Sequence, residues 1–467
     1  MLVACLNAVC WSIISPPFQV PDEPSHFAYT QLLAENQRLP SSSQTQYSRD
    51  EEAALADLKS LQLTARPDQS SITSSQEQQT LEKHLNAHLS RSGSGRVGGA
   101  GSGPPPYYLL ETIPYGLASA GTLLDQLELM RLLSALMGGM TALLVFLFLR
   151  ETLPATPWAW TVGGLCAALA PALGFISGAV NPDAMLFAVS AAIFYCLARA
   201  FRRGLTRRLA VVIGVLSAAG FLTKLNFIGL SPGVVLGLAV LSVRAARLNG
   251  RRAALISFAI AVAIAAAPAL AYLLANALSN RPLLGIVSIT LHAHGHSMLG
   301  ALSYIWQFYL PRLPGTTNYF PGLFTIRDLW FNKAIGFYGW LDTSFPPWVN
   351  NVALIPAGLI AGLCLRGLLA GRSALRRNLL EIGVYGATAV GLMALIGGSA
   401  YFNQNESIGF AEPRYLLPLL PLGAVMLALA ARGAGRRWGA PVGAVLVVLF
   451  LAHDIFSQLL VAGRFYS

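Results

Sequence analysis

Two adjacent acidic residues, Asp22 and Glu23, form the strongest chemical signal in this sequence. They stand between Pro21 and Pro24, directly after an apolar N-terminal segment and just before His26. Neighbouring carboxylates can deprotonate a hydroxyl or hold a divalent cation. The alternative is structural, because an acid followed by proline is a favourable start for a helix, with the acid as its cap. The pattern therefore leaves both a catalytic acid pair and a helix cap open.

Another acidic residue, Asp183, follows Asn181 and Pro182 in a tight connection between two apolar runs. Asparagine is a favourable helix cap, proline favours the first helical position, and an acid complements the helix dipole. Lys224 lies in a minimal turn between the next two apolar runs. A cation there is costly unless it is paired, so we expect a phosphate or Asp183 as its partner, with snorkelling to the membrane surface as the alternative.

Arg414 stands near the start of a late apolar run, between Glu412 and Tyr415. A cation is unfavourable at the amino end of a helix, where the dipole is positive. A bound anion would reverse that penalty, since a helix start combined with arginine suits phosphate. A salt bridge between Arg414 and Glu412 is the alternative.

Weaker signals and missing motifs narrow the chemistry. Alternating histidines at His292, His294 and His296 could bind metal from one face of a strand, although loop histidines are the simpler interpretation. The sequence contains no phosphate-binding P-loop, dinucleotide fingerprint, serine-hydrolase elbow or zinc-protease motif. We therefore expect an activated substrate or an ion gradient to supply the energy.

The elements that position these residues are predicted to be membrane-spanning helices. Apolar residues make up 54% of the 467 positions and charged residues only 11%. Each long apolar run can cross a membrane core, which takes about 20 helical residues. About eleven spans are predicted in one membrane domain over 1–467, at 1–15, 130–149, 158–178, 184–201, 209–223, 227–243, 253–276, 349–365, 378–398, 414–431 and 440–462. The first is interpreted as a retained anchor.

Topology explains the net charge of +11, and nucleic acid is not expected as a partner. Arginines concentrate in every second connection, around 150, 199–208, 244–252, 366–377 and 432–437. The positive-inside rule makes that side cytoplasmic. The N-terminus is then cytoplasmic, and all the candidate residues named above lie outside, in a multi-pass protein of the plasma membrane. The preference for arginine over lysine is typical of a GC-rich bacterial genome.

Two outer connections are long enough to be functional. Residues 16–129 are predicted to contain an amphipathic helix near 24–36 that lies on the membrane surface through Phe27, Leu32 and Leu33. A flexible Gly/Ser insert follows and ends at Tyr107 and Tyr108. Residues 277–348 are rich in aromatic residues and are expected to be ordered over the outer surface.

Taken in order, these motifs resemble the DUF2142 family of bacterial membrane proteins, a branch of the GT-C glycosyltransferase superfamily. The resemblance covers nearly the whole chain and rests on the segments 21–27, 105–110, 181–184, 224, 336–342 and 413–418. The polar stretch 37–103 matches no family motif. The resemblance implies an all-α polytopic fold with two long extracytoplasmic loops.

The resemblance also implies an inverting transfer of sugar from a polyprenyl-phosphate donor to a glycan, lipid or protein acceptor. Membrane lipids are the surrounding partner. The family's acids match Asp22, Glu23 and Asp183, and its phosphate-binding cations match Lys224 and Arg414. His26, Tyr107, Tyr108 and Tyr415 are the further substrate-binding candidates. A divalent metal ion held by Asp22 and Asp183 is left open as a cofactor.

Two rival functions share the same residues. A transporter or flippase of a lipid-linked sugar would use the cationic site without breaking bonds. A non-catalytic partner of an envelope polymerase would keep the fold and bind the lipid without turnover.

Overall fold

The structure is a computed structural model that describes residues 1–40, 46–65, 69–92, 100, 103–279, 297–320, 322, 325–402 and 412–467. Helices make up nearly all the ordered elements of these ranges. The exception is a short antiparallel hairpin of β1 (Phe337–Tyr338) and β2 (Thr343–Ser344). The predicted all-α class is confirmed.

Long apolar helices identify a multi-pass membrane protein. Within the described ranges, eight helical spans are long and apolar enough to cross a membrane. They are α7 (Leu123–Thr152), α10 (Pro182–Arg203), α12 (Phe227–Asn249), α13 (Arg251–Leu278), α16 (Pro347–Ala370), α18 (Leu379–Phe402), η4 with α19 (Pro413–Leu419, Leu420–Gly433) and α20 (Gly435–Tyr466).

The predicted number of eleven spans depends on three other apolar segments. The pair α8 (Pro157–Ala168) and α9 (Pro171–Ser177) bends by 52° and would make a ninth span. The bend is placed by Pro171, because proline disfavours a helical conformation in the residue before it. The remaining two, α1 (Leu2–Ile14) and α11 (Arg207–Thr223), are helices of only 13 and 17 residues. Eleven spans therefore stay a prediction.

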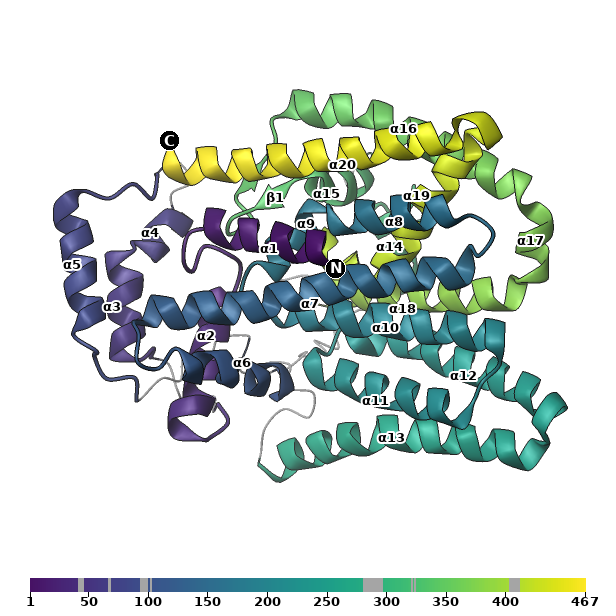
Figure 1. The fold of residues 1–467 in the computed structure, drawn as a ribbon, viewed down its shortest axis with the longest axis horizontal. Helices are drawn as coiled ribbons and strands as arrows, with labels where there is room; N and C mark the ends of the chain where they lie inside the picture. Colours follow the sequence, from purple (N-terminus) through teal and green to yellow (C-terminus); the bar gives the residue numbers. More distant parts are fainter. Residues whose placement is uncertain are drawn as a thin grey trace.

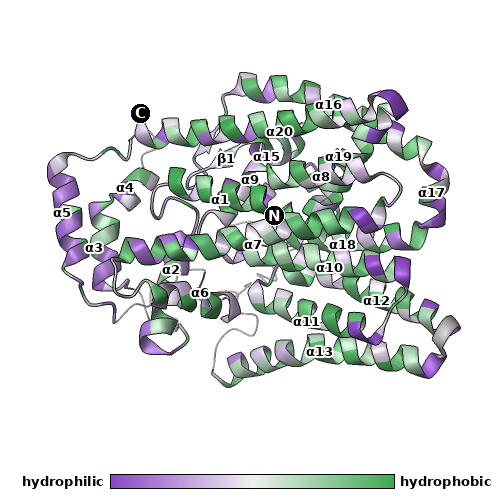
Figure 2. Ribbon diagram, in the orientation of Figure 1, coloured by the Kyte–Doolittle hydropathy of each residue, from purple (hydrophilic) through white to green (hydrophobic). Residues whose placement is uncertain are grey.

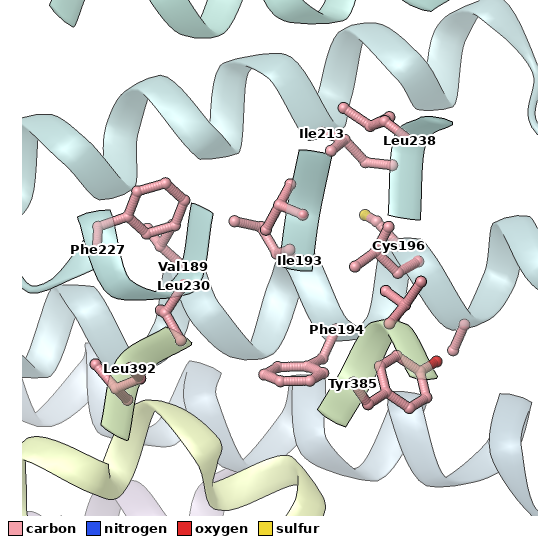
Figure 3. Packing of buried hydrophobic residues seen from close by; sticks show 14 of the residues in the cluster. Val189, Ile193, Phe194, Cys196, Ile213, Phe227, Leu230, Leu238, Tyr385 and Leu392 are labelled. Atoms are coloured by element: carbon pink, nitrogen blue, oxygen red, sulfur yellow. The ribbon is translucent and has the colours of Figure 1, made fainter. Parts of the chain in front are cut away.

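The long helices run roughly parallel and form one bundle (Figure 1). Hydrophobic residues cover most of them, whereas hydrophilic residues gather at α5 (Ser75–Asn86) and α17 (Arg372–Arg377) near opposite ends (Figure 2). The largest buried cluster joins α10, α11, α12 and α18, whose side chains interlock in Figure 3. The labelled contributors are Val189, Ile193, Phe194, Cys196, Ile213, Phe227, Leu230, Leu238, Tyr385 and Leu392.

Small residues let two of these helices approach closely. Gly229, Gly233 and Gly237 recur every fourth residue on α12. A Cβ added at Gly229 or Gly233 would collide with the backbone of α18 at Leu392 or Thr388. One added at Gly237 would lie 3.0 Å from Val384 of α18 and from Leu197 of α10. Such spacing is typical of helix contacts in membranes, where close packing takes the place of a hydrophobic driving force.

Helices of the first long connection gather at one end of the bundle, on the left in Figure 1. They are α2 (Glu23–Asn36), α3 (Arg49–Asp57), α4 (Ser60–Ala65), α5 and α6 (Pro106–Leu117). The expected surface role of α2 is wrong, because Phe27 and Leu32 are fully buried and Leu33 is 9% exposed. The protein packs around α2, and it is α6 that exposes an apolar face, through Leu109, Ile113 and Leu117. Most of the Gly/Ser insert lies outside the described residues.

The described part of 277–348 contains α14 (Met298–Tyr309), a π-helix η2 (Thr325–Asn332), α15 (Lys333–Ile335) and the hairpin. Aromatic rings pack together there: Phe308 contacts Phe320 and Trp330, and Tyr304 contacts Tyr401 of α18. This packing explains the aromatic composition of the segment. The histidines of 292–296 lie outside the described residues.

Candidate active site

Glu23 and Asp22 have opposite environments although they are neighbours. The Glu23 carboxylate is fully buried and pairs with one edge of the Arg131 guanidinium, with Arg131 Nε 2.8 Å from Oε1 and Nη2 2.6 Å from Oε2. Backbone N–H groups of Phe18 and Val180 donate to the same two oxygens, at 3.0 and 3.1 Å. These contacts occupy both oxygens of Glu23 and leave Asp22 as the available acid.

The Asp22 carboxylate is exposed to solvent and lies close to Arg414. Its side chain is 57% exposed, and its Oδ2 lies 3.6 Å from Arg414 Nη2. The residue occupies the cap position of α2 in a left-handed conformation (φ 65°), yet its side chain makes no capping hydrogen bond. Left-handed backbone at a non-glycine residue is disfavoured and concentrates at functional sites. The helix-cap explanation therefore does not account for this side chain.

Asp183 and Lys224 form an ion pair, as the sequence allowed. Lys224 Nζ lies 2.7 Å from Asp183 Oδ1, and the Asp183 side chain is 2% exposed. Asn181 caps α10 by accepting the Asp183 N–H at 2.9 Å. Asp183 Oδ2 has no hydrogen-bond partner among the described residues. The pair is thus fixed by a cap and retains one oxygen for a further donor.

Arg414 pairs with Glu412, which is the alternative that the sequence left open. The Nε of Arg414 lies 2.5 Å from Glu412 Oε2, although the contact lacks hydrogen-bond geometry. Burial raises the pKa of Glu412 to about 7, and Arg414 opposes that shift. Both cations lie close to the Tyr415 ring, whose centroid is 5.3 Å from Arg414 Cζ and 5.4 Å from Lys224 Nζ. Arg414, Tyr415 and Lys224 therefore belong to one cluster.

An apolar cavity of about 450 Å³ opens beside Arg414. Its charged lining residues are Lys333, Glu412 and Arg414. Lys333 was not predicted as a site residue, because nothing local distinguishes it from other loop cations. Its Nζ lies 4.3 Å from the Phe337 ring, and burial lowers the pKa of this lysine. The remaining walls are apolar or aromatic and include Phe175, Tyr309, Trp330, Tyr338 and Leu420.

His26, Tyr107 and Tyr108, the other predicted binding residues, form buried hydrogen bonds. His26 Nδ1 lies 2.9 Å from the Tyr108 hydroxyl, and burial lowers the pKa of His26 to about 4, so the ring is neutral at physiological pH. Tyr107 instead contacts Ser134 Oγ at 2.9 Å, and Ser134 donates to Glu111 at 3.0 Å. None of these residues lines the cavity. His26 interacts electrostatically with Asp22, Asp183, Lys224 and Arg414, so His26 and its partner Tyr108 lie next to the charged cluster. Tyr107 belongs to a separate hydrogen-bond network.

Most of the sequence matches one known protein family. Residues 5–423 match the family described as predicted membrane protein (DUF2142). The chain belongs to the DUF2142 family. No curated protein matches the sequence.

Solved structures resemble this DUF2142 protein at low sequence identity. ArnT from Cupriavidus metallidurans bound to undecaprenyl phosphate gives a TM-score of 0.49 at 15% identity, covering 92% of this chain and 59% of that chain. The apo oligosaccharyltransferase of Archaeoglobus fulgidus gives a TM-score of 0.46 at 14% identity, covering 99% and 55%. The DUF2142 chain thus covers less than two thirds of the chain in each of these two structures.

A metal site is not evident in the described part of this DUF2142 protein. Those residues contain no group of three or more His, Cys, Asp or Glu side chains that could hold an ion. Asp22 faces Arg414, and Asp183 faces Lys224, so each acid already has a cation as its neighbour. Metal binding by Asp22 and Asp183 stays an untested prediction.

Proposed function

We propose that this DUF2142 protein is a GT-C-type glycosyltransferase that takes a sugar from a polyprenyl-phosphate donor at the outer face of the membrane. The acceptor is a hydroxyl of a cell-envelope glycan, lipid or protein. One observation carries the proposal: the exposed Asp22 carboxylate lies 3.6 Å from a buried arginine, Arg414, which lines an apolar cavity. Such a transfer needs a base for the acceptor hydroxyl, a cation for the donor phosphate and an apolar space for the polyprenyl chain. Asp22, Arg414 and the cavity can supply these three parts.

The cavity suits the two chemical parts of the donor. Its apolar walls can enclose the first isoprene units, and Arg414 with Lys333 supplies positive charge for the phosphate. Arg414 Nη1 has no hydrogen-bond partner in the described part of the chain, so a buried donor is available to an anion. Alternation of arginine-rich connections would place this site on the outer side.

Asp22 is the proposed general base. It removes the proton from the acceptor hydroxyl as that oxygen attacks the anomeric carbon of the sugar. The bond between this carbon and the phosphate oxygen breaks, and its electron pair leaves with the polyprenyl phosphate. Arg414 and Lys333 stabilise the charge that grows on the departing phosphate. Attack opposite to the leaving group inverts the anomeric configuration.

The pair Lys224–Asp183 has a supporting role in this proposal. Its 2.7 Å contact fixes the Lys224 ammonium next to the Tyr415 ring, which also contacts Arg414. Because Asp183 Oδ2 lacks a hydrogen-bond partner among the described residues, it can accept a hydroxyl of the sugar or of the acceptor.

The test is sugar transfer in membranes that contain the full chain. A panel of radiolabelled polyprenyl-phosphate sugars is incubated with wild type, Asp22→Asn and Glu52→Gln, and label in the acceptor fraction is measured. Asp22→Asn should lose at least about 100-fold of the rate, which is the lower range for a lost general base. Glu52 is exposed on α3 and serves as the control.

One outcome would contradict the assigned base, and another would contradict the enzyme assignment. Undiminished transfer by Asp22→Asn would remove Asp22 as the base. Donor binding without transfer by wild type, across the whole panel, would favour the flippase or the non-catalytic partner. Flipping of a fluorescent lipid-linked sugar in liposomes would then separate these two.

A further inference from the structure

Arg414 is the shared counter-ion of two carboxylates with very different access to water. Glu412 lies 2.5 Å from its Nε and has a side chain that is only 5% exposed. Asp22 lies 3.6 Å from its Nη2 and has a side chain that is 57% exposed. An acid in contact with water is screened, whereas a buried acid keeps most of its electrostatic effect on its neighbours.

While Glu412 is ionised, the charges around this arginine balance before any substrate arrives. The acids Glu412, Asp22 and Asp183 face three cations, which are Arg414, Lys333 and Lys224. Lys224 already pairs with Asp183. A phosphate that enters the cavity adds negative charge next to Glu412 in a largely apolar space. Like charges in such a space repel strongly, so the phosphate and the ionised Glu412 cannot both be well accommodated at Arg414.

We infer that Glu412 competes with the phosphate of a polyprenyl-phosphate ligand for Arg414, and that this competition sets the affinity of the site for the donor, a phosphodiester, and for the polyprenyl monophosphate that the transfer releases. The inference rests on the proposed function for the identity of that ligand. Phosphate binding requires the Glu412 carboxylate either to move off Arg414 or to take a proton from water. Either route makes binding weaker whenever Glu412 is ionised.

The environment of Glu412 supports a proton-linked exchange. Its charged neighbours are Arg414 on η4, Lys333 on α15, Asp22 before α2 and Lys224 between α11 and α12. Burial raises the pKa of its carboxyl to about 7, so both forms are populated near neutral pH. Ionisation of Glu412 increases as the pH rises through this value. Glu412 should therefore weaken phosphate binding at alkaline pH and have little effect at acidic pH.

The experiment measures binding of a polyprenyl monophosphate to the purified full chain in lipid nanodiscs. Wild type and Glu412→Gln are compared between about pH 6 and pH 8.5, a window that spans the Glu412 titration. Glu412→Gln should bind roughly threefold to tenfold more tightly at the alkaline end and about equally at the acidic end, as expected for one competing charge. Comparing the two proteins at the same pH separates the contribution of Glu412 from the effect of phosphate ionisation on its contacts with the rest of the site.

Controls separate charge from shape and from folding. The matching polyprenol lacks the phosphate and should bind both proteins equally. Glu412→Asp keeps the charge and should keep the pH dependence of wild type. Glu381→Gln removes a carboxylate that bonds to Tyr385 at 2.8 Å, away from the cavity lining, and should behave as wild type. Thermal unfolding of each variant shows whether its fold is intact.

Failure of this inference can be distinguished from failure of the proposed function. If Glu412→Gln binds the phosphate no more tightly than wild type, while Arg414→Gln loses phosphate binding, only the role of Glu412 is wrong. If Arg414→Gln binds polyprenyl phosphate as well as wild type, the phosphate site of the proposed function is wrong too. Equally tighter binding of polyprenol by Glu412→Gln would show a change of cavity shape and would also overturn the inference.

Discussion

Glu23 and Arg131 form a buried bidentate ion pair that joins positions 108 residues apart, with side chains 0% and 3% exposed. The remaining N–H groups of Arg131 donate to the backbone carbonyls of Ser12, Ser15 and Pro16 at 2.9–3.2 Å. One guanidinium therefore ties the end of α1 and the following turn to the start of α2. The same contacts fix the backbone next to Asp22, so the pair positions the proposed base without touching the cavity.

Arg131→Met should lower the free energy of unfolding by about 3–5 kcal/mol, because it leaves the Glu23 carboxylate buried without its counter-ion. Thermal unfolding in detergent measures the change. Lys59→Met is the matched control, since it breaks an ion pair with Glu77 whose side chains are 36% and 39% exposed, and it should change stability little. The double variant Glu23→Gln/Arg131→Met should recover part of the loss. Equal melting of Arg131→Met and Lys59→Met would contradict the role assigned to this pair.

Much of the fold could be predicted from the sequence because its helices are specified locally. Apolar runs of about 20 residues have to form helices in a membrane, whatever their neighbours. Prolines at the first position of α8, α9 and α10 mark helix starts in the same local way. The expected surface position of α2 was wrong because burial depends on α6 and α7, which follow about 70 residues or more later. Composition alone does not show which of α2 and α6 faces outward.

Prediction of the site was limited by contacts between distant segments. Asp22, Asp183, Lys224 and Arg414 carried a local signal, as charges beside helix ends, and the structure brings them together. The different environments of Asp22 and Glu23 could not be seen, because they depend on Arg131. A single arginine inside the apolar run of α7 was a usable signal, since a charge within a spanning helix requires a partner. Lys333 had no comparable signal.

Close packing between α12 and α18 gives a second prediction. A methyl group at Gly233 would lie 2.5 Å from the backbone N and Cα of Thr388, so Gly233→Ala must push the two helices apart. We expect destabilisation of about 1–3 kcal/mol, the usual cost of overpacking. Gly358→Ala on α16 is the control, because its added methyl group meets no heavy atom of the described chain within 4 Å. Thermal unfolding should rank Gly233→Ala clearly below Gly358→Ala, and the opposite order would show that α12 and α18 do not pack this way.

Glu111 gives a prediction about pH. Its carboxyl is fully buried on α6, accepts a hydrogen bond from Ser134 at 3.0 Å, and has its pKa raised by burial to about 8. A folded-state pKa above the ordinary value of 4.5 means that the folded protein keeps a proton that the unfolded chain releases. This contribution to stability is complete below about pH 4.5 and falls by about 1.4 kcal/mol per pH unit until the pH passes 8. Glu111→Gln cannot ionise, so its stability should exceed that of wild type increasingly from about pH 6 to pH 8. Unfolding measured across this range checks the difference, and parallel curves for the two proteins would show that Glu111 is not a buried neutral acid.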